Sequence, residues 1–211
     1  MTKKETLTFL EKEKLIAIVR LFKREDIQPT IKQLVQGGIK VLEITSNTPG
    51  YIAEIGTARK LYPKIIIGAG TITCESQAID AIKGGAQFLV TPNTEASIVR
   101  AAHGHDIPVV MGALTPTEIC KAVTSGADII KLFPAGIMGL DYFKSIKGPL
   151  NDIKFFVVGA IGPKNIHNWL SAGALGIGIG NKLTDREDES KGFEQIKEKA
   201  EKFIKEFKVY Q

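Results

Sequence analysis

Short apolar segments alternate with longer amphipathic segments along the whole chain, and this alternation most constrains the fold. The apolar segments have the length and β-branched content of strands, and they lack a polar alternation, which is typical of parallel strands covered on both faces. Strands are expected at residues 15–21, 39–45, 64–69, 87–91, 107–111, 128–133, 154–158 and 174–179. Helices are expected after each of them, at residues 26–36, 52–61, 74–83, 95–102, 116–124, 140–147, 164–171 and 193–207.

Eight such strand–helix units in 211 residues predict a (β/α)8 TIM barrel, with an open doubly wound sheet as the alternative. A short extra helix is expected before the first strand, at residues 4–11. Residues 1–211 are expected to form a single barrel domain, because a chain of this length can bury one large core.

Composition narrows the range of partners. The net charge of +5 suits an anionic small molecule, but no basic stripe with interleaved aromatic residues indicates nucleic-acid binding. No run of about 18 apolar residues predicts a membrane span, and the first residues lack the apolar core of a signal peptide, so a cytoplasmic location is expected.

Cys74 and Cys120 are expected to be reduced thiols. His103 and His105 are expected in a solvated loop, so no metal site is predicted.

Lys131 lies inside the apolar run that ends at Pro134, which cannot donate to a strand ladder. Desolvation disfavours an ammonium group, so the pKa of Lys131 is expected below the usual value of about 10.4. A neutral lysine amine can attack a carbonyl carbon and form a Schiff base. The alternative is a strand lysine whose stem packs on apolar neighbours while its tip reaches water.

Functional residues of a TIM barrel lie at the carboxyl ends of its strands. Glu43 lies near the end of the second strand and Lys131 near the end of the sixth, on opposite walls of the barrel. The two side chains can meet if both point into the barrel. The sequence does not show whether they do, because strands buried on both faces lack a polar alternation. The alternative for Glu43 is an ion pair with Lys131 or Arg20 that only neutralises a buried charge.

A family resemblance rests on several motifs taken together, in this order and spacing: Leu42-Glu43-Ile44-Thr45, Gly68-Ala69-Gly70-Thr71, Thr91-Pro92, Thr115-Pro116-Thr117-Glu118 and Lys131-Leu132-Phe133-Pro134. With them, nearly the whole chain resembles the bacterial 2-keto-3-deoxy-6-phosphogluconate and 4-hydroxy-2-oxoglutarate (KDPG/KHG) aldolases. The resemblance implies a class I aldolase on a (β/α)8 barrel, without a metal or cofactor and usually a homotrimer. Such an enzyme cleaves a 2-keto-4-hydroxy acid to pyruvate and an aldehyde, either glyceraldehyde 3-phosphate or glyoxylate.

The chemistry of this cleavage suits the residues singled out above. Breaking the C3–C4 bond leaves electrons at C3, which a protonated imine at C2 accepts, and Lys131 can supply that imine. Glu43 is the candidate group that moves protons, directly or through a water molecule. Arg20 and Thr71 are candidates for holding the carboxylate of the keto acid. Two further candidates could be apolar walls of the site or ordinary core residues, namely Pro92 and Phe133.

The sequence departs from the common family pattern in two places. Asn47 stands where many relatives carry an Arg that binds the pyruvyl carboxylate, so Arg20 is expected to contribute more. Phosphate-binding relatives carry Thr-Gly-Gly after strand seven and Ser after strand eight, where this chain has Val158-Gly159-Ala160 and Asn181. Backbone N–H groups of residues 159–162 could still receive an anion. The substrate candidates are therefore 4-hydroxy-2-oxoglutarate and a sugar acid with or without phosphate.

Two other classes of function stay open on sequence alone. A phosphate-binding barrel isomerase or synthase without covalent catalysis would use Glu43 as a base and Lys131 as electrostatic support. A non-catalytic metabolite-binding barrel would bind 2-keto acids without releasing pyruvate.

Overall fold

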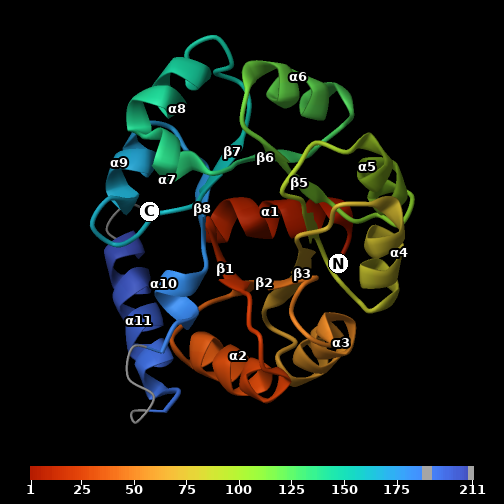
Figure 1. Ribbon diagram of the computed structural model, residues 1–211, viewed down its shortest axis with the longest axis vertical. Coiled ribbons are helices and arrows are strands. Elements are labelled where there is room, and N and C mark those ends of the chain that lie inside the picture. The colour runs from red at the N-terminus through yellow and green to blue at the C-terminus, as the bar shows by residue number, and fades with distance from the viewer. Residues whose placement is uncertain (187–191, 209–211) are drawn as a thin grey trace.

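The computed structural model describes residues 1–186 and 192–208. Parallel strands close into a barrel in which each strand pairs with the next along the chain and β8 pairs with β1 (Figure 1). This confirms the predicted (β/α)8 TIM barrel and excludes the open sheet. The strands are β1 (Leu15–Val19), β2 (Val41–Thr45), β3 (Ile66–Gly70), β4 (Leu89–Val90), β5 (Val109–Ala113), β6 (Ile129–Leu132), β7 (Phe155–Val158) and β8 (Gly176–Ile179).

Helices surround this barrel, and the extra N-terminal helix α1 (Lys3–Glu13) lies across one end of it (Figure 1). The longer expected helices are confirmed within a few residues at their ends. Three short elements were not expected, η1 (Arg24–Asp26), α7 (Ala135–Met138) and α10 (Asn181–Thr184), because each is too short to show a helical period. The other helices are α2 (Ile27–Gln36), α3 (Tyr51–Leu61), α4 (Glu75–Lys83), α5 (Ala96–His103), α6 (Pro116–Thr124), α8 (Leu140–Lys147), α9 (Ile166–Ser171) and α11 (Glu194–Lys208).

Local sequence explains where several of these elements begin. Thr115 caps α6, and its hydroxyl accepts from the backbone N–H of Glu118 while the Glu118 carboxylate accepts from the backbone N–H of Thr115. Strand β5 begins two residues later than expected, at Val109, because Pro108 has no N–H to give to the ladder.

Apolar side chains form two separate cores, one inside the barrel and one between the barrel and its helices. Successive side chains along a strand point to opposite faces, so each strand contributes to both. The interior core packs against α1 and consists of Leu10, Ile16, Val41, Ile66, Phe88, Val90, Val110, Ile129 and Phe156. The half of the barrel at the amino ends of the strands is therefore a filled apolar core. This leaves the half at the carboxyl ends of the strands for function.

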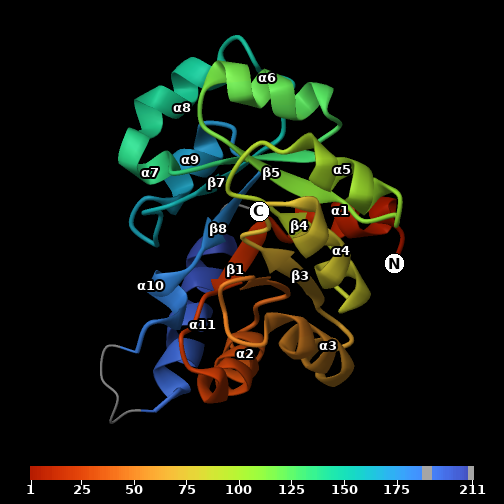
Figure 2. The same cartoon turned by 45° about the vertical axis from the view of Figure 1, so that its right-hand side comes forward.

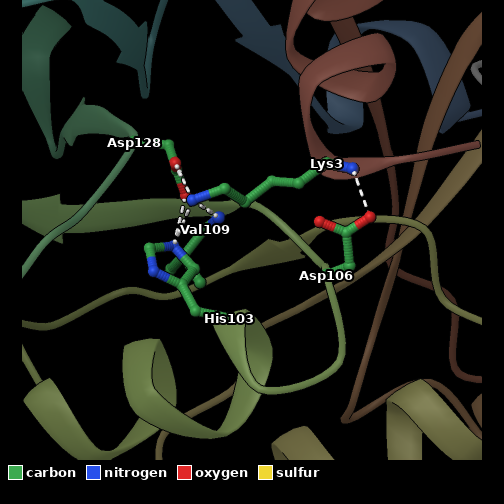
Figure 3. A network of polar contacts seen from close by, with 5 residues as sticks. All are labelled: Lys3, His103, Asp106, Val109 and Asp128. Carbon is green, nitrogen blue, oxygen red and sulfur yellow. Dashed lines mark hydrogen bonds and ion pairs between the residues drawn. The ribbon is translucent and has the colours of Figure 1, made fainter.

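A polar network joins α1 to the amino ends of β5 and β6 (Figure 3). The ammonium of Lys3 lies 3.1 Å from the Asp128 carboxylate, and Nε2 of His103 lies 2.8 Å from the same carboxylate. Asp128 also accepts from the backbone N–H of Val109. The expectation of a solvated loop is therefore wrong for His103, which is half-buried because this carboxylate holds it. Within residues 1–186 and 192–208, no cluster of His, Cys, Asp or Glu has a metal-binding arrangement.

Charges of alternating sign at helical spacing in the C-terminal run, residues 185–208, predict a solvated helix. Residues 187–191 of this run lie outside the described residues. Helix α11 instead buries one apolar face, formed by Ile196, Ala200, Phe203 and Phe207, and lies beside α2 (Figure 1 and Figure 2). Those residues recur at a helical spacing that the surrounding charges mask. In the part of the chain that the structure describes, no helix combines the length and apolar character needed to cross a membrane.

Candidate active site

A cavity of about 320 Å³ opens at the carboxyl ends of the strands, opposite α1. Most of the expected site residues line it: Arg20, Thr71, Pro92, Lys131, Phe133, Gly159, Ala160 and Asn181. Its wall also contains residues that the sequence did not single out as binding residues, including Ile18, Val158, Gly178 and Lys182. The only sequence signal for these additional residues was their position at or just after the end of a strand.

Lys131 points into the barrel from β6, two residues after Ile129 of the interior core. Its side chain is enclosed, with the whole residue only 4% exposed, and Nζ lies 5.2 Å from the centre of the Phe133 ring. Burial lowers the pKa of Lys131, the charge of Glu43 opposes this shift, and the charge of Arg20 adds to it. This environment favours the neutral, nucleophilic amine over the ammonium.

Glu43 points into the same interior from β2, two residues after Val41. The residue is 2% exposed, and its Oε1 atom has no hydrogen-bond partner among the described residues. Burial raises the pKa of Glu43, whereas the charges of Lys131 and then Arg20 lower it. Each of Glu43 and Lys131 is thus close enough to shift the pKa of the other. No salt bridge joins them within the described ranges, so the carboxyl group is not held in a direct ion pair.

Glycine on β3 makes room for the inward side chain of Glu43. In the barrel ladder, Glu43 pairs with Gly68, and Lys131 pairs with Gly112. A Cβ atom added to Gly70 would collide with the Glu43 carboxyl group. The GAG segment of β3 is therefore required by the carboxyl group beside it and by the Phe88 ring, which occupies the space next to Gly68.

A threonine holds the Pro92 wall of the cavity in place. The Thr91 hydroxyl accepts from the backbone N–H of Gly112 at 2.8 Å and donates to the carbonyl of Asn93 at 2.6 Å. The backbone of Pro92 packs so closely on Gly112 that a Cβ there would collide with it. The loop after β4 is therefore tied to β5 directly beside Lys131.

The two residues expected to hold a carboxylate lie side by side. Arg20 donates from Nη2 to the Thr71 hydroxyl at 3.4 Å, although the two residues follow different strands. Thr71 has a φ of 57°, which is unusual for a β-branched residue, and its carbonyl accepts from the Ser46 hydroxyl at 2.7 Å. Ala160, also in the cavity wall, has a φ of 55°. Strained backbone of this kind persists where the surrounding structure fixes a functional position.

Two expected residues, Glu43 and Asn47, are not part of the cavity lining. Glu43 is buried in the barrel interior near Lys131, which is a different position from that of Asn47. Asn47 lies away from the cavity. It is exposed, in the turn that follows β2. The buried residue of this turn is Thr48, whose hydroxyl bonds to Thr45 and to the carbonyl of Val19. Those bonds fix the direction of the turn, and Asn47 faces solvent, whereas Arg20 contacts Thr71.

Comparison with known proteins agrees with this geometry. The family described as KDPG and KHG aldolase matches residues 7–198. The chain is 32% identical over 196 residues to the 2-dehydro-3-deoxy-6-phosphogalactonate aldolase of Escherichia coli, covering 92% of this chain and 94% of that relative.

Two solved structures extend the likeness to three dimensions. A KDPG aldolase from Legionella pneumophila, with pyruvate captured at low pH as a covalent carbinolamine intermediate, has a TM-score of 0.82 and 27% identity over 90% of this chain and 93% of that one. A designed cube-shaped cage made by fusing symmetric oligomeric domains has a TM-score of 0.86 and 32% identity over 93% of this chain and 73% of that one. The family match and these relatives lead to one conclusion: the chain belongs to the KDPG and KHG aldolase family.

Proposed function

We propose that Lys131 is the Schiff-base lysine of this aldolase and that Glu43 moves its protons. Membership of the family makes the chain a class I aldolase, a carbon–carbon lyase that releases pyruvate from a 2-keto-3-deoxy-4-hydroxy acid. The observation that carries the residue assignment is a buried lysine near a buried carboxyl group whose Oε1 atom has no hydrogen-bond partner among the described residues, at the functional end of a barrel. The similar Legionella pneumophila aldolase forms a covalent intermediate with pyruvate, which supports the assignment of a Schiff-base lysine in this chain.

The proposed reaction begins when the neutral amine of Lys131 attacks C2 of the keto acid. The carbinolamine loses water to give a protonated imine, and the C3–C4 bond then breaks as its electrons move to the imine nitrogen. The C4 hydroxyl gives up its proton, and an aldehyde leaves. Protonation of the enamine at C3 and hydrolysis of the imine release pyruvate and restore the amine.

Glu43 suits each of these proton transfers because its raised pKa lets it both accept and give a proton. Arg20 and Thr71 are proposed to hold the C1 carboxylate so that C2 faces Lys131, because they contact each other in the cavity wall. Pro92 and Phe133 are proposed as walls that keep water from the amine. A barrel isomerase or synthase without covalent catalysis is the competing function, and it would leave Lys131 unmodified.

We also propose that the protein is a homotrimer and that it is located in the cytoplasm. Symmetric oligomeric domains in the similar cage support an oligomer. Large apolar side chains that stay exposed on the single chain, such as Phe22 and Ile137, also favour one. The exposed free thiols of Cys74 and Cys120 suit a reducing compartment.

Borohydride reduction in the presence of pyruvate tests the lysine. We expect loss of activity and one reduced pyruvyl adduct at Lys131, located by peptide mass spectrometry. Lys131→Met should abolish both labelling and turnover while keeping the circular dichroism of the fold. Lys40→Met, which removes a lysine ion-paired with Glu13 on the surface, is the matched control and should label normally. An active, unlabelled wild-type protein would refute the imine mechanism.

The pH dependence of labelling tests the shifted pKa. Because burial lowers the pKa of Lys131 below its reference value of 10.5, the neutral amine should be present at lower pH than in a free lysine. The rate of adduct formation should therefore rise with pH and level off below pH 10.5. Comparing Glu43→Gln separates the titration of the carboxyl group from that of the amine. A rate that keeps rising up to the reference value would contradict the assignment.

Replacing the carboxyl group tests the proton transfers. Glu43→Gln keeps the size of the side chain, so it should still form the pyruvyl adduct slowly but lose at least about 10²-fold in kcat. Glu54→Gln is the matched control, since Glu54 is also buried but is ion-paired with Arg24 outside the cavity. Full turnover by Glu43→Gln would remove Glu43 from the mechanism.

Light scattering of the purified chain tests the assembly. A homotrimer should give a mass three times the 22.9 kDa of the single chain. A stable mass of one or two chains at the same concentration would overturn the trimer without affecting the assignment of Lys131.

A further inference from the structure

Residues 46–48, directly after β2, form a turn that contacts the ends of both neighbouring strands, and it is called the β2 turn below. The turn itself does not line the cavity. The two residues proposed to hold the substrate carboxylate do line it, Arg20 from the end of β1 and Thr71 from the end of β3. The β2 turn therefore stands beside both residues without facing the substrate.

Thr48 fixes the backbone on both sides of Arg20. Its hydroxyl accepts from the backbone N–H of Leu21 at 3.3 Å and donates to the carbonyl of Val19 at 3.3 Å. Thr48 is only 1% exposed, so little water competes for these bonds. Arg20 is itself exposed and has a long side chain with many rotamers. The direction in which its guanidinium reaches therefore depends on the backbone that Thr48 holds.

Ser46 holds Thr71 in a comparable way. Its backbone N–H donates to the carbonyl of Gly70 at 2.8 Å, and its hydroxyl donates to the carbonyl of Thr71 at 2.7 Å. These carbonyls belong to the peptide groups on either side of Thr71. The φ of 57° at Thr71 is costly for a β-branched residue, and it persists where the surrounding structure fixes it. Ser46 supplies that restraint from the neighbouring strand end.

We propose that Ser46 and Thr48 are positioning residues that align Arg20 and Thr71 for the C1 carboxylate of the keto acid before it binds. The aligned pair is already in contact, because Nη2 of Arg20 lies 3.4 Å from the Thr71 hydroxyl. Groups that are ordered in advance bind a ligand more tightly, since less ordering has to accompany binding. This inference rests on the proposed aldolase function, which places the carboxylate at Arg20.

The pyruvate dependence of borohydride trapping tests the inference. Ser46→Ala and Thr48→Val each remove one hydroxyl and keep the rest of the turn. Each should raise the pyruvate concentration for half-maximal labelling of Lys131 about fivefold, the effect of losing one typical hydrogen bond. The limiting rate at saturating pyruvate should stay close to that of the wild type, because Lys131 and Glu43 are unchanged.

Control variants separate positioning from general support of the fold. Thr48→Ser keeps the hydroxyl and should retain the wild-type half-saturation concentration. Tyr142→Phe should retain it as well, although it removes a half-buried hydroxyl that donates to the carbonyl of Leu114 at 2.7 Å. Neither of these two residues lines the cavity. In a chain that already carries Arg20→Gln, Thr48→Val should add little to the loss, because the charge that it positions is absent.

Three results would overturn the inference. They are an unchanged half-saturation concentration in Ser46→Ala or Thr48→Val, an equal increase in Tyr142→Phe, and full additivity of Thr48→Val with Arg20→Gln. Labelling of the wild-type chain separates the two levels of the argument. An unlabelled Lys131 refutes the proposed function, whereas a labelled Lys131 with an unchanged half-saturation concentration in the variants refutes only the role of the β2 turn.

Discussion

Desolvation of one amine and one carboxyl group inside the same barrel is the constraint on which this site depends. Lys131 and Glu43 are both almost fully buried, and burial is the largest influence on the pKa of each. It favours the neutral form of both groups, whereas their mutual attraction favours the charged forms. No direct salt bridge joins the two groups within the described ranges. Both groups therefore remain available to exchange protons with a substrate.

The barrel can hold such groups because its interior is divided along its axis. Helix α1 and the apolar interior core fill the end at which the strands begin. Near the other end, Gly70 of β3 leaves room for the Glu43 carboxyl group, and Gly112 of β5 leaves room for the backbone of the Pro92 loop. The two cores around the strands supply the apolar burial that offsets the desolvation of the two functional groups. Stability and reactivity are thus assigned to opposite ends of one sheet.

The loops around the cavity have a different task from the strands. Thr91 ties the Pro92 loop to β5, and Ser46 holds the carbonyl of Thr71 beside Arg20. These contacts fix the part of the site that faces the reacting carbon. The loops after β7 and β8 form another part of the cavity wall, with Gly159, Ala160 and Asn181.

The sequence by itself determined the strand–helix units, their parallel arrangement and the ends of the strands, because these depend on local composition and spacing. It therefore identified Lys131 and Glu43 as candidates. Only the tertiary structure decided that both point inward, since strands that are apolar on both faces hide their alternation. It also decided that Asn47 faces solvent and Lys182 faces the cavity, because long-range contacts direct those loops. The burial of α11 and of His103 likewise depends on partners distant in the sequence.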